Sequence, residues 1–256
     1  RPDGAGSGGV VQWTSDDGGT TWTGGVLAAR NDMNGNAVAF GPPDAPRIAT
    51  IAHTGPCGAC VQEIRGGAYN GAAAQLGDEG PDRIYGSSLT LDNGLPVAAF
   101  FGLGATSYIR RWSGAGPITS TATWLPSTPV PGVEPAIAGG PGGLWFGNRA
   151  NFGQPFSVRK VTGAAVGPPT QITPSAHDAQ FFKLDQDPTG RLLAAWENRR
   201  PASGRGDDPP GVYLRSAPGG GAFGSQKLLL PGEGAGQLEL AATDDGGGFL
   251  IANRTG

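Results

Sequence analysis

The stretch Ser15-Asp16-Asp17-Gly18-Gly19-Thr20-Thr21-Trp22 decides the fold that we expect for this chain. Ser15 and Asp17 carry short side chains that accept hydrogen bonds from turn amides, and Gly19 permits a positive φ. Trp22 then supplies a large apolar surface that can be buried beneath the turn. The stretch therefore predicts a hairpin turn between two strands.

Further along the chain, one order of elements returns four times. Each copy has a first strand, a turn rich in Gly, Asp or Asn, and an apolar second strand, which is the pattern of a tight hairpin. The copies span residues 89–101, 136–146, 181–196 and 238–252. Because such a repeat at a spacing of roughly 40–50 residues is typical of propellers, we interpret the copies as blades.

The opening stretch also matches a known signature at all five fixed positions of S-x-D-x-G-x-T-W. It resembles the Asp-box of sialidases and related BNR-repeat proteins. Residues 216–223 resemble a decayed copy, in which Pro218 replaces Asp17 and Phe223 replaces Trp22. The resemblance implies a β-propeller in which this turn joins the third and fourth strands of a blade, away from the ligand face.

Counting strands sets the number of blades. The first residues supply only a third and a fourth strand, and the last residues supply only a first and a second strand. Four further blades lie between them, at about residues 31–78, 83–127, 131–173 and 177–231. We therefore predict one all-β domain over residues 1–256, a five-bladed β-propeller closed by N-terminal and C-terminal half-blades, because this pairing removes exposed sheet edges. The alternative is a fragment of a six- or seven-bladed propeller.

Composition narrows the classes of function. Gly 47 and Pro 23 are abundant among the 256 residues, but six Trp and ten Phe provide the core that a disordered chain lacks. The net charge of −3 offers no basic footprint for nucleic acid, and no apolar run approaches the length of a membrane span. Arg accounts for 15 of the 18 basic residues, which favours a bacterial gene of high GC content.

The two cysteines form Cys57-Gly58-Ala59-Cys60. A redox motif would need a thioredoxin-like βαβ context, and a zinc site would need more ligands than His53 and His177 can add. We predict a small disulfide at a hairpin tip, formed in an oxidising compartment. We therefore expect an extracellular or cell-surface protein, and we expect neither a metal nor a cofactor.

Candidate ligand-binding residues gather where second strands end. The pairs Asn148-Arg149, Asn198-Arg199 and Asn253-Arg254 each close a second strand, and His177, Asp178 and Glu197 lie beside them on the same face. Arg presents a planar fork suited to carboxylate or sulfate, and Asn both donates to and accepts from sugar hydroxyls. The pattern predicts a shallow site for an anionic or hydroxyl-rich ligand. The alternative is that the repeated guanidinium binds the neighbouring blade.

The function that we expect is an extracellular binding or scaffold module, acting as a monomer or as part of a larger protein, with a glycan or a surface protein as partner. The alternative is a sialidase-like glycoside hydrolase. Tyr85 or Tyr213 would then be the nucleophile, with Glu197 as its partner and Asp178 as the acid/base residue. The F/Y-R-I-P segment of sialidases is not present.

Overall fold

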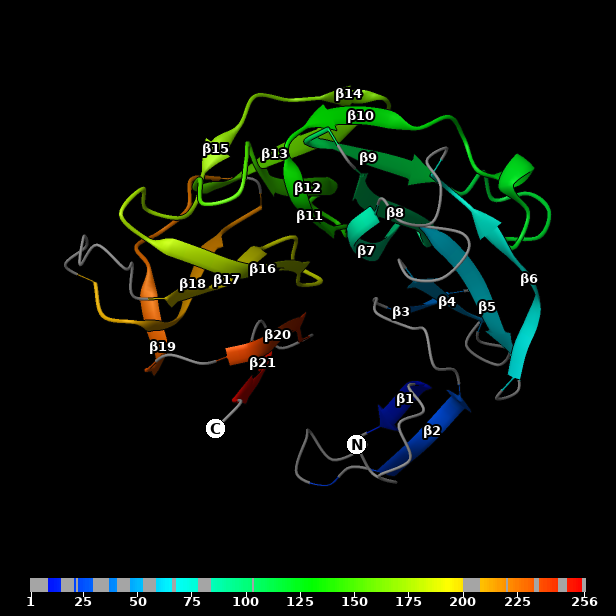
Figure 1. Cartoon of the computed structure of the whole chain (residues 1–256), viewed down its shortest axis with the longest axis horizontal. Helices are drawn as coiled ribbons and strands as arrows, with labels where there is room; N and C mark the ends of the chain where they lie inside the picture. Colours follow the sequence, from blue (N-terminus) through cyan, green and yellow to red (C-terminus); the bar gives the residue numbers. More distant parts are fainter. Residues whose placement is uncertain are drawn as a thin grey trace.

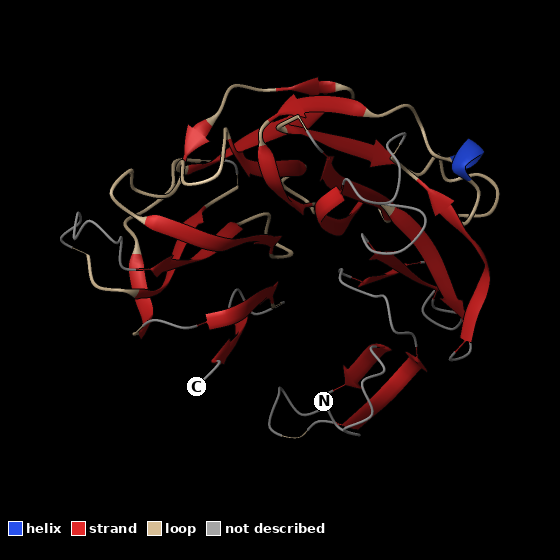
Figure 2. Ribbon diagram, viewed as in Figure 1, coloured by secondary structure: helices blue, strands red, loops and turns tan. Residues whose placement is uncertain are grey.

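Antiparallel strands make up most of the computed structural model, and η1 (Thr121–Thr123) is the one helical element in its described part (Figure 2). The structure describes residues 9–14, 21, 23–29, 37–40, 47–52, 59–65, 68–77, 84–102, 104–199, 208–219, 221–232, 235–243 and 248–254. Five residues given structural roles above lie outside these ranges, namely Ser15, Asp17, Gly19, Trp22 and Cys57.

Four antiparallel sheets follow one another along the chain. The first contains β3 (Ala37–Phe40), β4 (Arg47–Ala52), β5 (Cys60–Arg65) and β6 (Ala68–Gln75), and the second contains β7 (Ile84–Asp92), β8 (Leu95–Gly102), β9 (Thr106–Arg111) and β10 (Thr128–Pro131). The third contains β11 (Val133–Ala138), β12 (Leu144–Arg149) and β13 (Phe156–Thr162), with β14 (Ala165–Val166) and β15 (Thr170–Gln171) both paired to β13. The fourth contains β16 (Asp178–Gln186), β17 (Leu192–Arg199), β18 (Gly211–Ala217) and β19 (Lys227–Pro231). The predicted blade ranges 31–78, 131–173 and 177–231 each hold one such sheet, whereas the range 83–127 holds β7, β8 and β9 but ends before β10.

The two ends of the chain differ from the prediction. β1 (Gly9–Thr14) pairs with β2 (Thr23–Ala29), and β20 (Ala235–Ala242) pairs with β21 (Gly248–Arg254), but among the described strands these two hairpins are separate sheets. They lie at the two ends of an arc of sheets (Figure 1). Each hairpin pairs strands close in sequence, whereas closure must bring together the two ends of the chain at a larger cost in entropy. The described strands therefore do not confirm the predicted closure by paired half-blades.

The first strands of consecutive sheets contact one another. β7 contacts β3 and β11, and β16 contacts β11 and β20. These strands lie towards the middle of the arc, while β6, β10, β14, β15 and β19 lie at its periphery (Figure 1). Hydrogen bonds join the same strands, since Gly139 N donates to Thr90 Oγ1 at 2.9 Å and Ala242 N donates to Asp185 Oδ2 at 2.7 Å.

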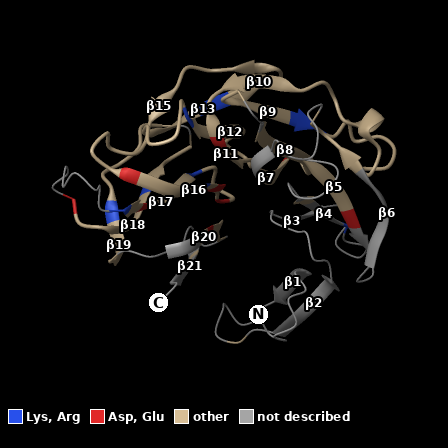
Figure 3. Ribbon diagram, in the orientation of Figure 1, with Lys and Arg blue, Asp and Glu red and all other residues tan. Residues whose placement is uncertain are grey.

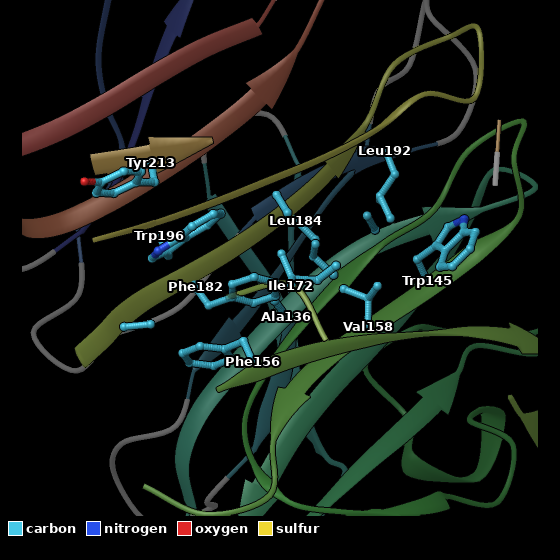
Figure 4. Close-up of a cluster of buried hydrophobic side chains, with 13 residues drawn as sticks. Ala136, Trp145, Phe156, Val158, Ile172, Phe182, Leu184, Leu192, Trp196 and Tyr213 are labelled. Carbon is cyan, nitrogen blue, oxygen red and sulfur yellow. The ribbon is translucent and has the colours of Figure 1, made fainter. Parts of the chain in front are cut away.

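The apolar core lies between neighbouring sheets because the second strands are buried on both faces. In β8, Ala98 and Phe100 pack against the first sheet, while Val97 and Ala99 pack against the third. Side chains alternate along a strand, so one apolar run can serve two interfaces. The largest cluster joins the third and fourth sheets, and Figure 4 shows Phe156, Phe182, Trp196 and Tyr213 among its members.

Four smaller observations complete the fold. Cys60 is disulfide-bonded, as the sequence predicts. The stretch that resembles a decayed Asp-box begins at Ser216, in the last two residues of β18, and so follows the third strand of its sheet. Acidic and basic side chains are interspersed over the described strands (Figure 3). In the described part of the chain, no helix combines the length and apolar character that a membrane span requires.

Close contact between β7 and β11 makes Gly139 sensitive to substitution. A Cβ atom at Gly139 would lie 2.0 Å from the backbone oxygen of Leu91. We expect Gly139→Ala to lower the free energy of unfolding by about 1–3 kcal/mol, because the two strands must move apart. At Gly224 the nearest atom to such a Cβ is 3.7 Å away, so Gly224→Ala is the matched control. Equal melting temperatures for the two variants would contradict the packing described here.

Candidate functional site

The three Asn-Arg pairs close the second strands β12, β17 and β21. Strand register places Arg149 opposite Val133, Arg199 opposite Asp178, and Arg254 opposite Ala235. In each case the arginine lies opposite the start of the first strand of its own sheet. The repeat therefore occupies equivalent positions, as the sequence predicts. The side chains of Asn253 and Arg254 lie outside the described part of the structure.

The side chain of Arg149 is buried between the third and fourth sheets and contacts both of them. Its side chain is 2% exposed, its Nη1 donates to the carbonyl of Ala179 in β16 at 3.0 Å, and its Nη2 forms an ion pair with Glu134. The guanidinium carbon also lies 4.9 Å from the ring centroid of Phe156. Burial raises the pKa of Glu134 even though the charge of Arg149 acts to lower it. Arg149 therefore makes the contact to the neighbouring sheet that the alternative interpretation describes.

The asparagines of the described pairs bind backbone. Asn148 donates to the carbonyl of Pro131 at 2.8 Å and accepts from Arg159 at 2.6 Å. Asn198 donates to the carbonyls of Asp208 and Pro209 over longer distances of 3.5 and 3.4 Å. Both side chains are buried. They hold the segments that lead into β11 and β18, rather than presenting amides to solvent.

Arg199 is placed differently from Arg149. Its side chain is 43% exposed, its Nε donates to the fully buried Glu197 at 2.8 Å, and its guanidinium carbon lies 5.0 Å from the ring centroid of Phe181. Asp178 lies opposite Arg199 in the register and accepts a hydrogen bond from Gln180 at 2.8 Å. We name Asp178, Phe181, Glu197 and Arg199 together the Arg199 site.

Phe181 has an unusual backbone. Its φ is 50°, and the register of β16 against β17 shifts between Gln180 and Lys183. A positive φ is uncommon for a bulky side chain, and such strain clusters at functional positions. The shift also re-aims the side chain, as β-bulges do. Register shifts occur near the starts of β7, β11 and β20 as well, and Glu134 in β11 has a φ of 54°.

His177 belongs to a buried chain of hydrogen bonds. Trp196 Nε1 donates to His177 Nδ1 at 3.1 Å, and His177 Nε2 lies 2.8 Å from Asp208 Oδ2. An indole nitrogen only donates, so Nδ1 must accept and Nε2 must carry the proton that goes to Asp208. The hydrogen bond from His177 is the main reason why the pKa of Asp208 is lowered. His177 therefore anchors the segment before β18 and does not face a ligand.

Tyr213 is poorly suited to act as a nucleophile. It is 2% exposed, and its hydroxyl donates to the carbonyl of Pro209 at 2.6 Å. Burial, together with the charge of Asp208, raises the pKa of Tyr213 and so disfavours the reactive phenolate. The side chain of Tyr85 lies outside the described part. Among the described residues, no group of three or more His, Cys, Asp or Glu is arranged to hold a metal.

Sequence reasoning identified the polar residues of the Arg199 site but missed Phe181. The site combines Arg199, Glu197 and Asp178. His177 instead binds Trp196, and Asn198 binds the backbone of Asp208. One signal was available, because the adjacent Phe181 and Phe182 interrupt the alternation of a half-buried strand and so indicate a bulge. The contact of Asp208 with His177 joins residues 31 positions apart and has no such signal.

Comparisons with known proteins leave the family open. No family model matches the chain, and no curated protein matches it. Among solved structures, a mannose phosphorylase from Leishmania mexicana in complex with phosphate aligns with a TM-score of 0.49 and 13% identity, over 86% of this chain and 79% of that one. An endo-1,4-beta-xylanase from Bacteroides thetaiotaomicron aligns with a TM-score of 0.44 and 13% identity, over 97% and 87%. At these scores neither likeness supports an argument about function.

The two arginines should respond differently to substitution. We expect Arg149→Ala to lower the free energy of unfolding by about 3 kcal/mol, because it leaves the carbonyl of Ala179 and the carboxylate of Glu134 without their partner. Arg199→Gln should cost less than Arg149→Ala, because the side chain of Arg199 is partly exposed and the amide can still donate a hydrogen bond to Glu197. Denaturant unfolding of both variants measures the difference. Similar losses would show that the two arginines share one role.

Asp208 should contribute a pH-dependent part of the stability. Because its pKa is lower in the folded state than in the unfolded state, its contribution is present above the ordinary carboxyl pKa and is lost as the pH falls through the lowered value. We expect Asp208→Asn to be less stable than the parent at neutral pH, with the difference shrinking in acid. Denaturant unfolding at a series of pH values, followed by Trp fluorescence, tests this. A constant difference would contradict it.

Proposed function

We propose that this protein is a β-propeller of the Asp-box type. Four consecutive sheets of up-and-down strands, first strands that contact their neighbours, and apolar clusters between adjacent sheets all support this architecture. The two terminal hairpins supply the four strands that a fifth blade needs. The proposal includes an extracellular or cell-surface location, because a disulfide at Cys60 is characteristic of an oxidising compartment.

For function we propose a binding module that recognises a glycan at the Arg199 site. The observation that carries this proposal is the pairing of the half-exposed Arg199 with Phe181, which is itself 36% exposed and held at a positive φ. Aromatic faces with a few fixed polar groups are typical of ligand sites. Here the phenyl ring offers an apolar face, Arg199 offers donors and Asp178 offers an acceptor, while the buried Glu197 holds the guanidinium of Arg199.

The sialidase-like alternative receives less support from the geometry. That chemistry requires arginines free to grip a carboxylate and a tyrosine free to attack. Arg149 is instead buried against Glu134 and Ala179, and the hydroxyl of Tyr213 is bound to a carbonyl. We therefore place binding ahead of hydrolysis.

A glycan array tests the binding function. We expect the parent protein to give a defined set of signals, and Phe181→Ala to weaken binding at least about fivefold through loss of the aromatic face. Leu229→Ala is the matched control, because Leu229 is an apolar side chain of similar exposure, 40%, on the peripheral strand β19. A parent protein without signal, or a Phe181→Ala variant that binds as tightly as the control, would overturn the proposal.

A further inference from the structure

We infer that the Arg199 site takes an uncharged, hydroxyl-rich ring and discriminates against acidic sugars. This inference rests on the proposed binding function and deepens it by naming the class of ligand. It follows from the balance of charge around Arg199, from the faces that the aromatic rings expose, and from the hydrogen-bonding capacity of the site.

Charge is the first argument. Within the described part of the site, the carboxylates of Asp178 and Glu197 accompany the single guanidinium of Arg199, so the formal charge of the site is negative. Glu197 is completely buried and accepts a hydrogen bond from the Nε of Arg199 at 2.8 Å, so a ligand carboxylate would have to compete with a buried charge for this guanidinium. An acidic sugar would therefore meet a guanidinium that is already neutralised and a second carboxylate that repels it.

The neighbouring sheet repeats this arrangement. Arg149 is paired with Glu134, and its remaining described hydrogen bond goes to the carbonyl of Ala179, two residues before Phe181. The contact fixes the start of β16 against the end of β12. Neither guanidinium is left without an acidic partner.

Aromatic rings supply the second argument. Phe152, which is 58% exposed, lies 5.5 Å from the guanidinium carbon of Arg149, just as Phe181 lies against Arg199. Two exposed phenyl rings thus each lie against the arginine of their own sheet. A neutral pyranose has an apolar face formed by its C–H groups, and a phenyl ring can cover that face without dehydrating a charge.

Hydrogen-bonding capacity is the third argument. The outer nitrogens of Arg199 can only donate, and the carboxylate of Asp178 can only accept. A hydroxyl group does both, so a ring with neighbouring hydroxyls can bridge Arg199 and Asp178 at once. A ligand carboxylate can only accept and would offer Asp178 no donor beyond the one that Gln180 already supplies. The mixture of donors and acceptors therefore favours a polyol over an anion.

The test uses an array of glycans in pairs that differ only in a carboxyl group. Suitable pairs are lactose-type chains with and without a terminal sialic acid, and hexose oligomers beside the corresponding uronic acid oligomers. We expect the parent protein to bind neutral members at least about tenfold more tightly than acidic ones, with little change between low and high salt. Asp178→Asn should narrow this preference, and Leu229→Ala should leave it unchanged.

The outcomes separate this inference from the binding function itself. Binding confined to acidic members, weakening at high salt and strengthening in Asp178→Asn, would overturn the inference while the binding function stands. Equal binding to both members of each pair would also overturn it. Absence of binding to every glycan would overturn the binding function and the inference together. Circular dichroism of each variant shows that altered binding does not come from unfolding.

Discussion

Burial of the second strands on both faces is the constraint on which the structure depends. β12 is buried at every position, and β17 at every position except its last. Successive side chains of such a strand enter two different cores, so a single apolar run holds three sheets in place. Polar side chains are excluded from the run unless they are satisfied, because an unpaired buried polar group is costly. The polar side chains at the ends of these strands can therefore either bind neighbouring sheets or remain available to a ligand.

The Asn-Arg pairs at the ends of β12 and β17 differ in this respect. At the end of β12 both side chains are buried and bound by neighbouring groups, and Arg149 carries the contact from one sheet to the next. At the end of β17 the asparagine remains structural, but the arginine is partly exposed. Because the sheets share one order of strands, a single repeated dipeptide supports the scaffold in one sheet, while its arginine is partly exposed to solvent in another.

A local distortion of β16 makes this difference. The register shift and the positive φ of Phe181 bring its ring to the guanidinium of Arg199, whereas the corresponding strand β11 places the carboxylate of Glu134 against Arg149. The residue with positive φ in each strand is thus the one that contacts the arginine. It is an acid, Glu134, beside the buried Arg149, and an exposed aromatic ring, Phe181, beside the partly exposed Arg199. Meanwhile His177, Tyr213 and Asn198 fix the segment before β18 with hydrogen bonds.

The sequence alone determined the strands and their grouping into four sheets, because alternation and turn residues act over a few neighbouring positions. It also placed the three arginines at equivalent strand ends, since the repeat fixes their register. Only the tertiary structure decided which arginine is buried, that His177 binds Asp208, and that the terminal hairpins form separate sheets. These outcomes depend on contacts between segments distant in the chain, where packing and loop closure override local pattern.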